Sequence, residues 1–190
     1  MARGNHPSIR VTANANTANA NPIPGAQVDS TQHNNNLEDT DTILIGDTIT
    51  KDIRTAKMDN YFVPETSVSE LMEMIPAIIA NQPATKKIVI HTGSHDILNL
   101  KQGSKILKLD FTLLLELQHH TTISGPIPTL NRGIESFSRL LSLNTWLTTA
   151  CSAHKIHFID YFNIFWNCSS RFKSDRIHPN WRGSGCLMQT

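Results

Sequence analysis

Short apolar runs rich in branched residues recur along the chain after residue 40, and most of them end at a glycine or a polar residue. They lack the strict alternation of a half-exposed strand and are typical of strands buried on both faces, as in a parallel sheet. One weaker run is expected to form a strand at the edge of the sheet. The runs, with the edge candidate last, fall at 42–46, 87–93, 121–126, 156–160 and 58–63.

Between these runs, apolar residues recur at the three- and four-residue spacing that places them on one face of a helix. The spacing predicts helices over 67–81, 104–119 and 134–154. Ser67 begins a capping-box pattern at the start of the first helix, and Pro76 is expected to kink or split that helix. Strands that alternate with helices form right-handed βαβ units. We therefore predict three layers, α/β/α, around a parallel sheet of about five strands.

Residues 1–40 differ in composition from the rest, because alanine and asparagine dominate and no apolar period is visible. Such a segment cannot bury enough apolar surface to offset its ordering entropy, so we predict a disordered tail. The folded domain is expected to span 41–190, which is long enough to bury a sizeable core. The sequence ends soon after the glycine-rich segment 182–185, so we predict that the domain lacks a closing C-terminal helix and leaves one face of the sheet uncovered.

Composition and charge exclude several classes of protein. The formal net charge is +1 and the longest basic run is Lys86-Lys87, so the sequence carries no strong nucleic-acid signal. No stretch approaches the roughly 20 apolar residues of a membrane span, and residues 1–10 lack the apolar core of a secretory signal. The three cysteines lack metal-ligand spacing. We therefore expect an intracellular, cytoplasmic protein without cofactor or metal, whose oligomeric state stays open.

Polar residues follow the predicted strands at their carboxyl ends, which is where open parallel sheets bind ligands. We expect a hydroxyl group, carboxylates and imidazoles to gather at one rim of the sheet. Imidazole and carboxylate groups also suit a zinc site, but no short ligand motif supports one. The residues that could approach one another for such a site are His91, His95, Asp96, Asp175 and His178. The candidate catalytic and binding residues are Asp47, Thr48, Glu65, Gly93, His95, Asp175 and His178.

Four short blocks resemble, in order and spacing, the SGNH hydrolases, which are also called GDSL-type esterases and lipases. The blocks are Gly46-Asp47-Thr48, the turn at Glu65, Gly93-Ser94-His95-Asp96 and Asp175-Arg176-Ile177-His178-Pro179. The segments 124–128 and 162–166 are similar to variants of this domain in vertebrate genomes, including those carried by non-LTR retrotransposons. The resemblance covers about residues 41–186 and implies a flavodoxin-like α/β/α fold that binds an ester or acyl ligand.

The resemblance also implies a role for each matching residue. Thr48 stands where the family has its nucleophilic serine. Glu65 stands at the glycine whose backbone N–H joins the oxyanion hole, and His95 stands at the asparagine that donates its side-chain amide. The family's general base and its orienting carboxylate are both retained, as His178 and Asp175.

The three departures all weaken the expected chemistry. Thr48 keeps a hydroxyl group, but its methyl group restricts χ1 and crowds the approach to a carbonyl carbon. Glu65 loses the conformational freedom of glycine and brings a negative charge toward a developing oxyanion, and His95 would donate with a different geometry from that of an amide. We predict an esterase-like domain with weak or absent hydrolysis. The alternative is a non-catalytic binding or accessory module of retroelement origin, or a decayed product.

Structural readings of the same residues stay open as well. Thr48 suits the N-cap of a helix that begins near Ile49. His95 suits a loop histidine that is bonded to a neighbouring carboxylate or to the backbone. Asp175 and His178 suit a structural pair that holds the last loop in place.

Overall fold

The computed structural model describes residues 9–12, 26–28, 41–53, 58–98, 104–116, 121–130 and 132–188. At its centre lies a parallel sheet that confirms the prediction of about five strands. The strands are β3 (Thr42–Gly46), β4 (Met58–Phe62), β5 (Lys87–His91), β6 (Thr121–Ser124) and β7 (His157–Ile159). They lie in the order β4-β3-β5-β6-β7, which is the flavodoxin-like order of a doubly wound sheet. The chain reverses its direction of winding between β3 and β5, so the ligand-binding crevice is expected outside the carboxyl ends of these two strands.

Two further short strands lie within the segment that the sequence predicted to be disordered. β1 (Ile9–Thr12) pairs antiparallel with β4, and β2 (Ala26–Val28) pairs with β1, so β4 is not the edge strand that we predicted. Local composition cannot report such strands, because their backbone hydrogen bonds depend on the open edge of a distant strand. The rest of 1–40 lies outside the described residues, and its disorder stays a prediction.

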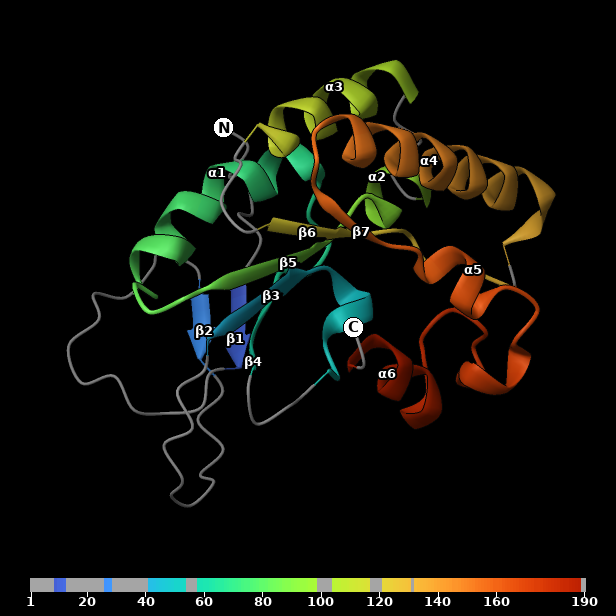
Figure 1. Ribbon diagram of the computed structural model, residues 1–190. Helices are drawn as coiled ribbons and strands as arrows, with labels where there is room; N and C mark the ends of the chain where they lie inside the picture. The colour runs from blue at the N-terminus through green and yellow to red at the C-terminus, as the bar shows by residue number, and fades with distance from the viewer. Residues whose placement is uncertain are drawn as a thin grey trace, which may run out of the picture.

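Helices cover both faces of the sheet, as Figure 1 shows. On one face lie α1 (Val68–Ala80), α2 (Ser94–Leu98), α3 (Ser104–Leu115) and α4 (Gly133–Ala153). The other face carries α5 (Tyr161–Phe165), α6 (Trp181–Met188) and the 3-10 turns η1 (Thr48–Thr50) and η2 (Ser169–Arg171). Alternate residues of each strand enter a different core, so that Ile43 and Ile45 pack against the first set of helices and Leu44 against the second. This arrangement confirms the three predicted layers.

The three long helices confirm the helical spacing of the sequence, with one correction. The Ser67 side chain accepts a hydrogen bond from the Glu70 N–H, and the Glu70 carboxylate accepts one from the Ser67 N–H, so the predicted capping box is formed. The helix α1 then continues through Pro76 and is not split there. Pro76 lies on the exposed side of α1, where water can solvate the carbonyl group that loses its partner.

The prediction that the domain lacks a closing helix is wrong, because α6 forms at the end of the chain. The Asn180 side-chain oxygen accepts hydrogen bonds from the backbone N–H groups of Arg182 and Gly183, and this caps the helix. Leu187 is buried in the second core. Gly183 lies at a close contact within this packing, since a Cβ atom there would overlap the Arg171 carbonyl oxygen. In the described part of the chain, none of the helices combines the length and apolar character that crossing a bilayer requires.

Candidate active site

The carboxyl end of β3 turns directly into η1, and Asp47 fixes this turn. Its buried carboxylate accepts a hydrogen bond from the Ile49 N–H at 3.0 Å, and Thr50 Oγ1 donates to the Asp47 carbonyl oxygen at 2.9 Å. Glycine is needed at position 46, because a Cβ atom there would overlap the Thr50 side chain. Asp47, and not Thr48, is the N-cap of the turn. The reading of Thr48 as a helix cap is therefore wrong, and its side chain is exposed at the rim.

Asp175 and His178 form a hydrogen-bonded pair. His178 Nδ1 lies 2.8 Å from Asp175 Oδ2, while Asp175 Oδ1 accepts hydrogen bonds from the N–H groups of Ile177 and His178, each at 2.9 Å. The two backbone N–H groups, followed by the imidazole, lower the pKa of Asp175 to about 2. The carboxylate is thus held ionised and oriented toward the imidazole ring.

The loop that carries this pair is tied to the segments after β3 and β6. Lys173 Nζ forms an ion pair with Asp52 Oδ2 at 2.8 Å, just beyond η1. The Leu130 N–H donates to the Arg176 carbonyl oxygen at 3.0 Å. Because these segments leave the carboxyl ends of their strands, the loop lies at the same rim of the sheet as Thr48.

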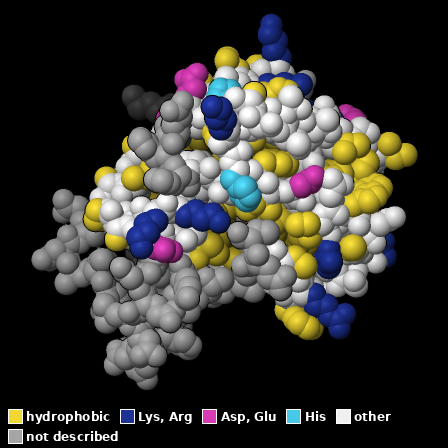
Figure 2. Space-filling view, viewed as in Figure 1, with side chains coloured by type: hydrophobic (Ala, Val, Ile, Leu, Met, Phe, Trp, Pro, Cys, Tyr) yellow, Lys and Arg dark blue, Asp and Glu magenta, His cyan; other side chains and the backbone are white. Residues whose placement is uncertain are grey.

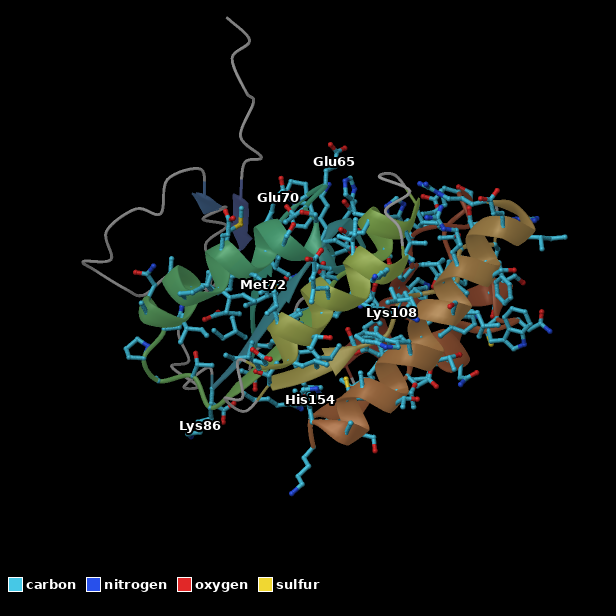
Figure 3. All side chains as sticks on the ribbon, turned by 90° about the horizontal axis from the view of Figure 1, so that it is seen from above. Glu65, Glu70, Met72, Lys86, Lys108 and His154 are labelled. Atoms are coloured by element: carbon cyan, nitrogen blue, oxygen red, sulfur yellow. The ribbon has the colours of Figure 1, made fainter. Side chains whose placement is uncertain are left out.

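Glu65 lies in the turn after β4, and its backbone is unusual. Its φ is +52°, the left-handed conformation that favours glycine. The N–H of Val63 donates to the Gly46 carbonyl oxygen at 2.8 Å, which places this turn beside the end of β3. The Glu65 side chain is exposed and points away from the molecule, at the end that also carries Glu70 (Figure 3). The turn thus keeps a glycine-like backbone although its residue is glutamate.

The third block follows β5 and begins α2. Gly93 has a φ of +97°, and a Cβ atom on it would lie 2.9 Å from the Phe111 ring, so glycine is required there. The N–H of Asp47 donates to the His91 carbonyl oxygen at 3.3 Å and joins this strand end to that of β3. His95 is half-buried in the first turn of α2, so it is not the loop histidine of the structural reading.

Asp96 is a buried group that the sequence analysis considered only as a possible metal ligand. Its carboxylate accepts a hydrogen bond from the Val68 N–H, with the Oδ2 atom at 3.2 Å, at the first turn of α1. Burial raises the pKa of Asp96 to about 6, although the Val68 N–H and the charge of His95 oppose this rise. Asp96 therefore links α2 to the start of α1 and supports the position of the third block.

A buried polar pair lies beneath the rim. His91 Nδ1 lies 2.8 Å from Ser124 Oγ, and burial lowers the pKa of His91. A polar pair at the ends of two buried strands has no signal in the apolar pattern, so the sequence did not single it out for catalysis. Among the described residues, no group of three His, Cys, Asp or Glu side chains is arranged to hold a metal ion.

The fold and this rim define a class of protein: a three-layer α/β/α domain with an exposed hydroxyl group and an Asp–His pair at the carboxyl edge of a parallel sheet. No family model and no curated protein matches the sequence. A solved structure with 35% sequence identity is the esterase domain of the ORF1 protein from the zebrafish ZfL2-1 retrotransposon; the match covers 78% of this chain and 94% of that one, with a TM-score of 0.44. On this identity and coverage, together with the fold, the chain belongs to the SGNH hydrolase family.

Other solved structures share the fold at lower identity. One is AlinE4, an SGNH-hydrolase family esterase, with 12% identity and a TM-score of 0.56 over 81% of this chain and 94% of that one. Another is the lipase/acylhydrolase from Enterococcus faecalis, with 14% identity and a TM-score of 0.63 over 77% of this chain and 90% of that one. These matches confirm the predicted α/β/α architecture.

Proposed function

We propose that the rim is a slow carboxylic-ester hydrolase centre in which Thr48 is the nucleophile. The observation that carries the proposal is the contact between His178 and Asp175, at 2.8 Å, in a loop tied to the segment just beyond η1. An imidazole that donates Nδ1–H to an ionised carboxylate presents its Nε2 lone pair on the other side of the ring, as a general base requires.

In the proposed first step, His178 Nε2 removes the proton of Thr48 Oγ1 as this oxygen attacks the carbonyl carbon of the ester. The tetrahedral intermediate then collapses, the bond to the alcohol oxygen breaks, and His178 returns the proton to the departing alcohol. Water, deprotonated by His178, attacks the acyl-threonine and releases the carboxylic acid. Asp175 stabilises the imidazolium in both halves of the reaction.

The proposed oxyanion donors are the backbone N–H of Thr48 and the side chain of His95. The turn at Glu65 supports a third donor, because its positive φ keeps the backbone conformation of a glycine. Its carboxylate carries the wrong sign for a developing oxyanion, but solvent screens the charge because the side chain is exposed. Loss of one oxyanion donor costs about 10²–10³ in rate, so we expect turnover well below that of a serine esterase.

The test is hydrolysis of a short-chain activated ester by the purified protein, by Thr48→Ala and by Thr48→Ser. We expect slow turnover that Thr48→Ala abolishes and Thr48→Ser raises, since serine removes the methyl group that crowds the attack. Thr149→Ala is the matched control, because Thr149 is an exposed threonine near the far end of α4. If folded wild-type protein and all variants match the buffer blank, the proposal fails and a non-catalytic binding module remains.

The origin of the domain is a second part of the proposal. The 35% identity to an esterase domain of a retrotransposon protein supports a retroelement origin for this chain. On the face in view in Figure 2, the Lys and Arg side chains of the described residues are scattered singly or in small groups and form no continuous basic stripe. An accessory role in nucleic-acid binding therefore has less support than a role at the ester site.

A further inference from the structure

The helix α3 exposes a stripe of large apolar side chains. Ile106 is 57% exposed, Leu109 60% and Leu113 44%. Their spacing places them on one face of the helix, while Leu107 and Phe111 fill the core on the opposite face. A surface helix normally carries polar residues outside. A contiguous exposed apolar stripe of this kind marks a contact surface.

The charged residues at the two ends of this stripe indicate what binds there. Lys105 lies in the first turn of α3, and Glu116 follows its last residue; both side chains are exposed. Each charge stands at the wrong end for the dipole of its own helix, which favours acidic residues at the N-terminus and basic ones at the C-terminus. The same placement becomes favourable if a second α3 lies alongside in the antiparallel direction. Each lysine then lies near the C-terminal end of the other helix, which carries Glu116 and the negative end of the helix dipole.

We propose that α3 is a homodimer interface, in which two copies of this chain pair their α3 helices antiparallel about a two-fold axis beside Leu109. In this register Ile106 faces the partner's Leu113, and Leu109 faces its own counterpart. The stripe is therefore self-complementary, as a two-fold interface requires. Lys105 and the partner's Glu116 are offset by only about 3 Å along the axis, at 1.5 Å per residue, within reach of a lysine side chain.

The position of α3 leaves room for such a partner. It lies between α1 and α4, and Figure 3 looks down on the side of the molecule that these three helices form. A membrane surface fits the stripe less well, because a helix that binds anionic lipid carries an excess of basic residues, whereas Lys105 and Lys108 are balanced here by Asp110 and Glu116. A short helix pair buries an area at the low end of specific interfaces, so we expect a dissociation constant on the order of 10 µM.

The experiment is sedimentation equilibrium of the full chain across concentrations below and above that value. We expect the weight-average mass to rise from the monomer value of 21.2 kDa toward twice that value. Leu109→Lys places two like charges face to face at the axis and should weaken the dimer at least tenfold. Ile134→Lys is the matched control, since Ile134 is 86% exposed on α4 outside the stripe, and it should leave the dimer unchanged.

A charge exchange tests the antiparallel register. Lys105→Glu alone should weaken the dimer, and adding Glu116→Lys should restore it, because the reversed pair is again complementary. Circular dichroism on each variant establishes that the fold is kept. A wild-type chain that stays monomeric throughout, or a Leu109→Lys variant that dimerises as well as wild type, would overturn the interface. Co-sedimentation of a monomeric chain with phosphatidylcholine vesicles would assign the stripe to lipid instead. If the double variant does not recover dimerisation, the antiparallel register is overturned.

Discussion

The Nδ1 atom of His178 lies 2.8 Å from the Oδ2 atom of Asp175, and the other oxygen of this carboxylate accepts two backbone N–H groups of the same turn. These donors lower the pKa of Asp175 to about 2, so the carboxylate is ionised in any assay near neutral pH. A fixed negative charge favours the tautomer in which Nδ1 carries the proton. The orientation of His178, the general base of the proposed reaction, thus depends on hydrogen bonds within one turn of the last loop.

The first prediction concerns this pair. Asp175→Asn keeps an oxygen that can accept the backbone N–H groups, but it removes the charge and permits the wrong imidazole tautomer. We expect the rate of ester hydrolysis to fall about 10²–10⁴-fold, in line with the loss of the carboxylate from a serine-protease triad. The measurement is kcat/KM for a short-chain activated ester near neutral pH.

The control for this variant is Asp52→Asn, which removes a carboxylate that holds the same loop through Lys173 but does not contact the imidazole. We expect a much smaller effect, because an exposed ion pair contributes little to stability. Equal losses in both variants would mean that the loop position alone matters and that Asp175 has no orienting role.

The second prediction concerns the left-handed backbone at Glu65, which has a φ of +52°. Glycine adopts this conformation without the strain that a side chain brings, which costs on the order of 1 kcal/mol. Glu65→Gly should therefore stabilise the fold slightly and raise the rate of ester hydrolysis slightly, because it also removes a negative charge at the rim that solvent screens only in part. Thermal unfolding and kcat/KM measure the two effects separately.

Two matched variants separate strain from charge. Glu65→Gln removes the charge and keeps the strain, so it should raise activity without raising stability. Lys155→Gly relieves the same kind of strain, at a φ of +57°, in the turn before β7 and away from the rim, so it should raise stability without raising activity. A faster Lys155→Gly variant would show that strain relief acts globally and that Glu65 is not near the reaction.

The sequence was sufficient to predict the five parallel strands and the long helices, because each has a local signal. The strands are short apolar runs, and the helices repeat apolar residues at helical spacing. The resemblance to the SGNH hydrolases placed Asp175 and His178 together, and their hydrogen bond agrees with it. The sequence analysis missed β1, whose hydrogen bonds are made to β4, a strand far along the chain. It missed α2 and α5 because a helix of five residues is too short to show a period.

The errors at the site have a common physical cause. Thr48 and Asp47 are both good helix caps, and only the three-dimensional turn decides that Asp47 accepts the Ile49 N–H. The glycine-like φ of Glu65 cannot be read from a glutamate. The role of Asp96 as an acceptor for α1 was missed, because it depends on contact between two helices that are distant in sequence. Local patterns therefore predict elements, while hydrogen bonds between elements need the fold.

The third prediction follows from the pKa of Asp96, which burial raises from 3.8 to about 6. Because the folded-state pKa lies above the unfolded one, the neutral carboxyl group stabilises the fold fully below 3.8, and this stability is lost as the pH rises through about 6. Asp96→Asn should remove this contribution to the pH dependence of the unfolding free energy. The variant should therefore be more stable than wild type at neutral pH. A tenfold difference in proton affinity between the folded and unfolded states corresponds to about 1.4 kcal/mol of stability.

The measurement is urea denaturation of wild type and variant at several values between about pH 4 and pH 7. Asp175 does not confuse the result, because its lowered pKa, about 2, puts its own loss of stability at more acidic pH. His91, whose pKa burial lowers, adds a pH dependence of the opposite sign, but this is common to wild type and variant and cancels in the difference between them. Glu73→Gln, at an exposed carboxylate of α1, is the control and should keep the wild-type slope. A slope unchanged in Asp96→Asn would assign the pH dependence to other groups.

The last prediction concerns α6, the helix that the sequence did not predict. Replacing each of its two glycines, Gly183 and Gly185, with alanine should change the stability of the fold in opposite directions. A Cβ atom on Gly183 would overlap the Arg171 carbonyl oxygen and approach Pro179 Cβ to 2.9 Å, whereas one on Gly185 meets nothing within 4 Å. Gly183→Ala should therefore destabilise the fold by about 1–3 kcal/mol through overpacking. Gly185→Ala should stabilise it by about 0.5–1 kcal/mol, because alanine has the higher helix propensity.

The pair of variants tests whether α6 closes the second face of the sheet, where Leu187 is buried and its carbonyl oxygen accepts a hydrogen bond from Tyr161 Oη at 2.9 Å. Thermal and urea denaturation provide the two free energies of unfolding. If α6 were frayed from the sheet, both alanines would raise helix propensity and neither would meet Arg171. Stabilisation by both variants would therefore contradict the packed position of α6. Changes of opposite sign in the free energy of unfolding would show that α6 packs closely against Arg171 at Gly183.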